Sequence, residues 1–178
     1  MAEANTFTIE TIYSLPEGKR AELVDGNLYM MAPLNRRHQE LVGALYRVIG
    51  NHIASKGCSC IPYVAPFAVF LSKDDKNYVE PDISVVCDKS KLTDHGCEGA
   101  PDWIIEVVSP GSQKMDYMIK LFKYKTAGVK EYWIVDPKDE TVAIYDFAKD
   151  DMEKYTFQDK IVREGATGVS VCMAELVF

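Results

Sequence analysis

The chain has 178 residues, 47% of them hydrophobic and 26% charged, a balance that excludes a disordered or low-complexity chain and suffices for one packed core. A net charge of −7 argues against a protein that coats nucleic acid nonspecifically, because such proteins carry an excess of basic residues. The N-terminal MAEANTF has no secretory pattern, and the longest nearly apolar stretch, YVAPFAVFL, is too short to cross a membrane.

A short helix and a β-hairpin are predicted first. The helix covers about residues 8–15 and is stopped by Pro16. In RAELVDGNLYMMAP, two alternating segments flank an Asp25-Gly26 pair, which is typical of a tight hairpin turn. We therefore expect an antiparallel pair that covers one side of a core.

A longer helix and three strands follow. Asn35 can cap a helix that runs to about Ser55, with apolar residues at helical spacing. Prolines within residues 61–71 restrict that strand to an edge, bend or bulge. The next strands, VEPDISVVCD (79–88) and PDWIIEVV (101–108), each contain a Pro-Asp pair, and the apolar character of the second suits a central position.

The last third of the chain predicts a helix and further strands. Ser112 can cap a helix to about Ala127, and its expected core face consists of Met115, Met118, Ile119, Phe122 and Thr126. EYWIVDP and TVAIYDF are predicted as a strand and its hairpin partner, and short strands should follow from Glu153. The result is one α/β domain over residues 1–178, with a mixed sheet and the central order α-β-β-β-α-β.

Glu106 is the most informative residue, because a carboxylate within WIIEVV is either solvated or held in the interior at a cost of several kcal/mol. Side chains alternate along a strand. If the strands containing Asp82 and Glu106 are neighbours, the two carboxylates converge. Such a pair can hold Mg²⁺ or Mn²⁺, which polarises a phosphodiester and lowers the pKa of an attacking water.

The segments VEPDISVV, PDWIIEVVSPGS and DYMIKLFKYKTAGVKEYWIVDP, with RAELVDGNLYMMAP and Arg-Arg-His near the N-terminus, resemble the Uma-two family of restriction-endonuclease-like proteins. This family belongs to the PD-(D/E)XK nuclease superfamily. The resemblance implies the superfamily's core fold, DNA as substrate, and a metal held by Asp82 and Glu106. It also implies additional outer ligands or phosphate contacts at Glu22, His38 and Glu40.

The superfamily's usual strand lysine is absent, because Val108 stands two residues after Glu106. Lys120 is four residues after Asp116 and four before Tyr124, so the three share one side of a helix. Lys120 should lie at the margin of the packed face, with its ammonium reaching a strand end. Spacing alone favours an exposed Asp116–Lys120 pair worth about 0.2–0.5 kcal/mol, whereas the resemblance implies that Lys120 acts beside Glu106.

Several other residues have a structural and a functional interpretation. Glu80 alternates with Asp82 but is expected to be an exposed edge glutamate, and His38 can be a helix-surface or capping residue. Lys114 and Lys123 belong to a locally basic helix that can contact phosphates or simply be solvated. Tyr132 and Trp133 are expected in the core.

The five cysteines include Cys58 and Cys60 in a CxC, without a CxxC pair or histidines at finger-like spacing. Free thiols in a cytoplasmic protein are therefore expected, without a structural zinc site.

The leading hypothesis is a Mg²⁺- or Mn²⁺-dependent endonuclease that hydrolyses DNA, with Asp82 and Glu106 on the metal and Lys120 in support. The alternative is a catalytically inactive module of the same fold that binds nucleic acid or protein, because the strand lysine is missing and the net charge is acidic. A homodimer is compatible with either hypothesis.

Overall fold

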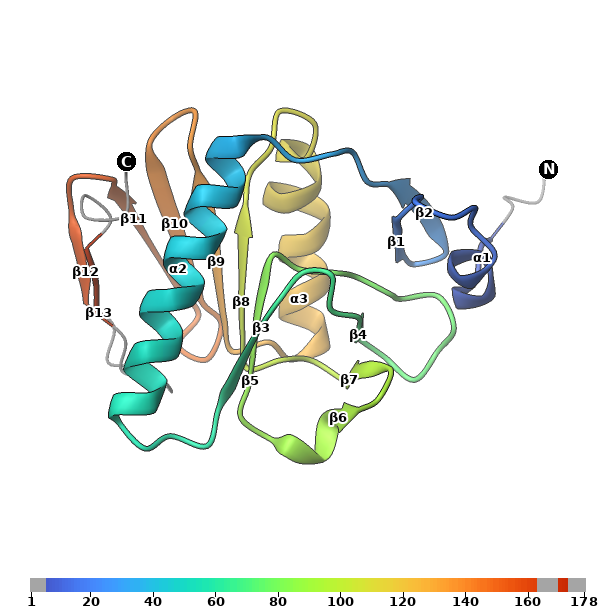
Figure 1. The fold of residues 1–178 in the computed structure, drawn as a ribbon, viewed down its shortest axis with the longest axis horizontal. Helices are drawn as coiled ribbons and strands as arrows, with labels where there is room; N and C mark the ends of the chain where they lie inside the picture. Colours follow the sequence, from blue (N-terminus) through green and yellow to red (C-terminus); the bar gives the residue numbers. More distant parts are fainter. Residues whose placement is uncertain (1–5, 163–169, 173–178) are drawn as a thin grey trace.

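A six-stranded mixed sheet lies at the centre of the computed structural model, which describes residues 6–162 and 170–172 (Figure 1). Its strand order is β11-β10-β9-β8-β5-β3. The strands are β3 (Ile61–Val64), β5 (Ile83–Val86), β8 (Trp103–Val107), β9 (Glu131–Asp136), β10 (Thr141–Asp146) and β11 (Asp151–Thr156). β8 and β9 are parallel and the other neighbours antiparallel, because a helical connection allows the parallel crossover.

Two helical segments cover opposite faces of this sheet (Figure 1). α2 (Arg36–Ser55) packs its apolar side against Ile83, Ile105 and other residues of one face. The segment η2 (Met115–Lys120) and α3 (Leu121–Ala127) cover the other face, where Tyr124 packs with Ile104. Alternation along β5 and β8 divides their side chains between these two cores.

Smaller elements surround the central sheet. α1 (Ile9–Tyr13) precedes the hairpin of β1 (Ala21–Val24) and β2 (Asn27–Met30), whose two turn residues both have positive φ, as a primed two-residue turn requires. The remaining elements are short: β4 (Val69–Phe70), η1 (Lys89–Lys91), β6 (Leu92–Thr93), β7 (Gly96–Glu98), β12 (Lys160–Val162) and β13 (Ser170–Cys172). Residues 163–169 and 173–178, part of the predicted C-terminal strands, lie outside the described residues.

The predicted mixed α/β architecture is confirmed, and the elements of the central sheet and its two covering helices follow along the chain as α2, β3, β5, β8, α3 and β9, before β10 and β11. β8 is an interior strand, and the proline-containing β3 is at the edge of the sheet. The hairpin of β9 and β10 forms as expected, with Tyr132 and Trp133 fully buried. Asn35 caps α2 by accepting a hydrogen bond from the backbone N–H of His38 at 2.9 Å.

The predicted core face of the helix over residues 112–127 is wrong for Met118, Phe122 and Thr126. Met118 and Phe122 are 63% and 70% exposed, and Thr126 is also exposed. The buried residues of this segment are instead Asp116, Lys120 and Tyr124. η2 is a π-helix, yet Asp116, Lys120 and Tyr124 still share one side, so the error concerns which side faces the interior. Lys120 and Tyr124 point inward because they contact Glu106 of β8, and Lys120 also contacts Glu22 of β1.

The expectation of only free thiols is also wrong, because Cys60 and Cys87 form a disulfide. Their separation of 27 positions in the chain hides this proximity in the sequence. Cys60 precedes β3 and Cys87 follows β5, and these strands are antiparallel neighbours. Among the described residues, no helix is both long and apolar enough to span a membrane.

Candidate functional site

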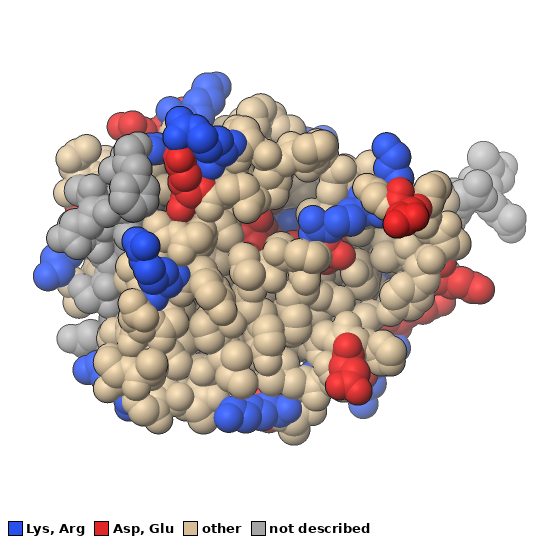
Figure 2. Space-filling view, in the orientation of Figure 1, with Lys and Arg blue, Asp and Glu red and all other residues tan. Residues whose placement is uncertain are grey.

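A pocket of about 680 Å³ opens between the β-hairpin, the N-terminal end of α2, the ends of β5 and β8, and η2. Its charged lining residues are Glu22, Glu80, Asp82, Glu106, Asp116 and Lys120. Figure 2 shows acidic and basic atoms within a hollow, with a basic side chain at its edge. The most polar part of the molecular interior therefore lies at the bottom of this pocket.

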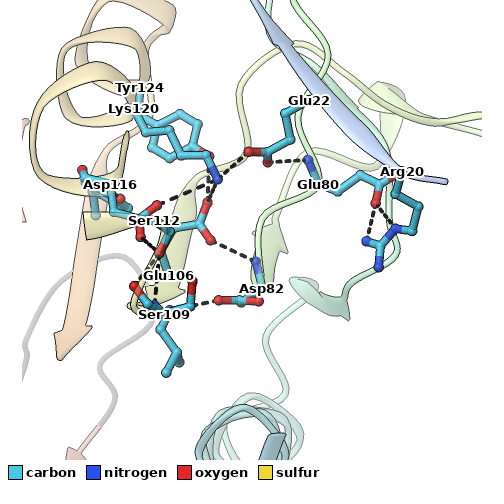
Figure 3. Close-up of polar contacts among 12 residues, drawn as sticks. Arg20, Glu22, Glu80, Asp82, Glu106, Ser109, Ser112, Asp116, Lys120 and Tyr124 are labelled. Carbon is cyan, nitrogen blue, oxygen red and sulfur yellow. Dashed lines mark hydrogen bonds and ion pairs between the residues drawn. The ribbon is translucent and has the colours of Figure 1, made fainter. Parts of the chain in front are cut away.

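Glu106 on β8 is at the centre of the polar cluster and is only 4% exposed. Its Oε1 accepts hydrogen bonds from the Lys120 ammonium at 2.7 Å and the Tyr124 hydroxyl at 2.8 Å. Its Oε2 accepts from the backbone N–H of Asp82 at 3.3 Å (Figure 3). The glutamate predicted to be held in the interior is thus buried and fully engaged.

Asp82 lies directly before β5, beside Glu106 on the neighbouring strand. Its Oδ2 accepts a hydrogen bond from the backbone N–H of Val107 at 2.8 Å. Nε2 of His38 is 3.0 Å from the same oxygen. Because a carboxylate only accepts, His38 donates from Nε2, and its Nδ1 is buried without a hydrogen-bond partner.

His38 is 2% exposed, so the interpretation of its side chain as a helix-surface group is wrong. The backbone N–H of His38 donates a hydrogen bond to the capping side chain of Asn35, while the His38 ring extends from α2 to Asp82. His38 thus takes part in the cap of α2 through its backbone and lines the pocket with its ring.

Lys120 is 5% exposed, so the exposed-pair interpretation is wrong. Its ammonium is 2.7 Å from Glu106, 2.8 Å from Oε2 of Glu22 and 3.8 Å from Oδ1 of Asp116. Burial lowers the pKa of Lys120, but the Glu106, Glu22 and Asp116 carboxylates outweigh burial and hold that pKa well above its ordinary value. Lys120 is therefore a permanent cation in this site.

Burial and neighbouring charges shift the pKa values of two carboxyl groups in the site, those of Glu106 and Asp116. Burial raises the pKa of Glu106 well above its usual value; Lys120 opposes this shift, while Asp82, Asp116 and Glu22 add to it. Burial likewise raises the pKa of Asp116 to about 6, against the opposing Lys120 charge and the Ser112 hydrogen bond. Like charges at short range disfavour ionisation, so the neighbouring carboxylates add to the effect of burial at both groups.

The β-hairpin contributes Glu22 to this network (Figure 3). Oε1 of Glu22 accepts from the backbone N–H of Glu80 at 3.0 Å, while its Oε2 contacts Lys120. Glu80 is 8% exposed, which corrects its expected place at an exposed edge. Its carboxylate accepts from the Tyr78 hydroxyl at 2.7 Å and pairs with Arg20, and neither of these partners had any signal in the sequence.

The other proposed contacts lie outside the pocket lining. Glu40 pairs with Arg36 at 2.6 Å on α2. Lys123 pairs with Asp25 of the hairpin turn at 2.5 Å, and Lys114 is exposed just before η2. Hydrogen bonding and burial therefore single out Glu22 and His38 from the residues considered as outer contacts.

Asp116 and Tyr124 were placed beside Lys120 by helical spacing without being assigned a role. Tyr124 is fully buried and donates to Glu106, and Asp116 accepts from the Ser112 hydroxyl at 2.6 Å. The i, i+4 spacing of the three residues was the available signal, but it did not reveal that their side faces the interior.

The chemistry of Asp82 and Glu106 fits a divalent cation such as Mg²⁺ or Mn²⁺. Magnesium prefers oxygen ligands and commonly uses one or two carboxylates, with water and substrate phosphate completing its shell. Within residues 6–162 and 170–172, no group of three or more His, Cys, Asp or Glu side chains is arranged to hold a metal ion. A cation held by two carboxylates and completed from solvent and substrate is the arrangement that suits these residues.

A family model described as "Putative restriction endonuclease", that of Uma2, matches residues 9–170. The chain belongs to the Uma2 family. The match spans the hairpin, both Pro-Asp segments and the helix that supplies Lys120, and it confirms the resemblance seen in the sequence. Among curated proteins, none matches this Uma2 chain.

A solved structure described as "a putative nuclease belonging to DUF820 from Anabaena variabilis ATCC 29413" has the same fold. The TM-score is 0.78 at 19% sequence identity, and the match covers 96% of this Uma2 chain and 97% of the other. At this identity, the similarity concerns the fold.

Proposed function

We propose that this Uma2 protein is a Mg²⁺- or Mn²⁺-dependent endonuclease that hydrolyses DNA phosphodiester bonds. The observation that carries the proposal is the contact of Lys120 with Glu106 at 2.7 Å. The lysine comes from η2, yet its charge lies beside the carboxylate of β8, next to which the superfamily's strand lysine would be expected. Membership of the Uma2 family supports a nucleic-acid substrate.

Each residue has a role that follows from its surroundings. Asp82 and Glu106 would hold the cation, which when bound polarises the phosphate and lowers the pKa of a water. Lys120 stays protonated and stabilises negative charge that develops on the phosphate. A lysine with a raised pKa is a poor general base, so Lys120 acts as a hydrogen-bond donor and a fixed charge.

Glu22 and His38 act through these residues. Glu22 holds the Lys120 ammonium from the side opposite Glu106, while His38 and the backbone N–H of Val107 fix the orientation of Asp82. Fixed donors and charges are effective in catalysis because they need no rearrangement when the reaction occurs.

The test uses purified protein with labelled DNA and either MgCl₂ or MnCl₂. D82N and E106Q each preserve side-chain shape but remove a charge, and we expect both to lose at least a hundredfold in cleavage rate. E98Q removes a charge from an exposed residue outside the pocket lining and should retain the wild-type rate. Equal rates in wild type, D82N and E106Q would reject the assignment.

One observation favours the alternative of a catalytically inactive binding module. Both oxygens of Glu106 already accept hydrogen bonds from protein groups, so the cluster also serves as a structural ion network. DNA binding that is unchanged by EDTA and by K120M, without cleavage under any metal condition, would support this alternative.

A further inference from the structure

The charged groups of the pocket are all at its floor. Asp82, Glu106 and Lys120 are 8%, 4% and 5% exposed. A phosphate that reaches them must enter the pocket, because the outer molecular surface does not present these side chains. The depth of the site therefore restricts which strand of DNA can bring a phosphate to it.

The two walls of the pocket carry no charge. One wall is the segment 28–35, with the sequence LYMMAPLN, and the other is the loop 109–112, with the sequence SPGS; both segments line the pocket. Met115 extends the second wall. Apolar side chains and one aromatic ring, that of Tyr29, thus stand above the charged floor.

Uncharged walls are poorly suited to a continuous duplex. Proteins that bind duplex DNA neutralise the phosphates around the contact with Lys and Arg. The two wall segments contain neither, and the basic residues that flank them in the sequence, Arg36, Arg37 and Lys114, do not line the pocket. Apolar and aromatic side chains instead suit the faces of unpaired bases, which stack and pack against them. The pocket volume of about 680 Å³ is that of sites enclosing one small-molecule-sized ligand.

We propose that the substrate is DNA that is unpaired at the scissile phosphate, and this inference rests on the proposed function. A single nucleotide enters between segment 28–35 and loop 109–112, its base packs against the apolar walls, and its phosphate reaches Asp82, Glu106 and Lys120. Single strands, flaps and overhangs are substrates, and an intact duplex is excluded.

The experiment compares fluorescent oligonucleotides of one sequence, presented as a single strand, a blunt duplex and a duplex with a splayed single-stranded flap. With MnCl₂, we expect kcat/KM for the single strand and the flap to exceed that for the duplex at least tenfold, with flap cuts confined to the unpaired arm. Equal or faster cleavage of the duplex would overturn the inference while leaving the proposed function intact.

Binding separates the two proposals if no cleavage occurs. Fluorescence anisotropy with CaCl₂ in place of MnCl₂ should give tighter binding of the single strand than of the duplex. That result in a protein that cuts nothing would reject the endonuclease and support the unpaired strand as ligand. Duplex binding as tight as single-strand binding would overturn the inference.

A wall substitution makes the assignment specific to this pocket. L34D places a carboxylate in the apolar wall, and we expect it to weaken single-strand binding about tenfold. V162D makes the same kind of change at an exposed residue of β12, outside the pocket lining, and should bind like wild type. Equal binding by L34D, V162D and wild type would place the strand elsewhere and overturn the inference.

Discussion

The two helical segments on opposite faces of the central sheet bury different chemistry. α2 buries Leu41, Leu45 and Ile49 and exposes polar residues. The segment η2–α3 buries Asp116 and Lys120 and exposes Met118 and Phe122. Both cover the same sheet, yet one follows the usual distribution of apolar residues and the other reverses part of it.

The comparison shows which helix contributes most to stability and which supplies the lysine of the site, although α2 also places His38 in the pocket. Each fully buried leucine or isoleucine of α2 contributes about 1.5–3 kcal/mol from its removal from water. A buried ion network contributes little net stability, because the cost of desolvating its charges offsets the attraction between them. The inward-facing Lys120 of η2 is therefore better explained by the chemistry of the pocket than by folding.

Removing the Lys120 charge should have the largest effect on stability. K120M leaves Glu22 and Glu106 buried beside each other without a cation, which costs about 3–5 kcal/mol in the free energy of unfolding. Urea denaturation at pH 7.5 measures this loss. The variant should also cut DNA at least a hundredfold more slowly.

A triple variant, E22Q/E106Q/K120M, provides the control. It removes all three charges with little change in volume, and we expect its stability to return to within about 1–2 kcal/mol of wild type while activity stays lost. A triple variant as unstable as K120M would mean that the shape of the Lys120 side chain, rather than charge pairing, maintains the fold here.

On α2, the expected effect of a comparable truncation is smaller but still large. Leu45 is fully buried against the sheet, and L45A should lower the free energy of unfolding by about 2–5 kcal/mol through lost burial and a cavity. Because Leu45 does not line the pocket, folded L45A should keep the wild-type kcat at a temperature well below its Tm. A loss below 1 kcal/mol would contradict the assignment of α2 as the stabilising helix.

The fold was largely predictable from the sequence because its signals are local. An Asp-Gly turn, an Asn cap and apolar strands bounded by prolines specify elements through short-range chemistry. The disulfide was not predictable, because Cys60 and Cys87 meet only when β3 pairs with β5. The orientation of η2 was missed because an apolar side of the helix was expected to face the core, whereas the side with Asp116, Lys120 and Tyr124 faces the interior.

The site was partly predictable for a related reason. Strand alternation and the two Pro-Asp segments brought out Asp82 and Glu106, and the structure brings them together with Lys120. The contacts of His38 with Asp82 and of Arg20 with Glu80 join residues 44 and 60 positions apart. Such long-range pairs leave no periodic trace in a single sequence.

Asp116 provides a pH test of the inward-facing polar side of η2. The pKa of Asp116 is raised by burial to about 6 from 3.8, so the native state retains this proton to a higher pH than the unfolded state. This group therefore lowers stability as pH rises from about 4 to about 6. D116N lacks this cost and should be more stable than wild type by about 1–3 kcal/mol at pH 7.5.

The measurement is urea denaturation of wild type and D116N between pH 4.5 and pH 7.5. The gap between the two proteins should be small at the acidic end, where the wild-type carboxyl is mostly protonated in the native state, and should widen through pH 6. A gap that is constant with pH would show that Asp116 is stabilised as an anion by Lys120 and Ser112 beyond the cost of its burial.

The smallest effect is expected on the outward side of η2–α3. Phe122 is 70% exposed, so F122A removes little buried surface and should change the free energy of unfolding by no more than about 0.5 kcal/mol. L45A is its matched partner, a large apolar residue cut to alanine on the opposite helix. A loss for F122A comparable to that for L45A would mean that another molecule covers Phe122 in solution. The two helices would then differ in what buries their apolar residues, which is the chain itself for α2 and a binding partner for η2–α3.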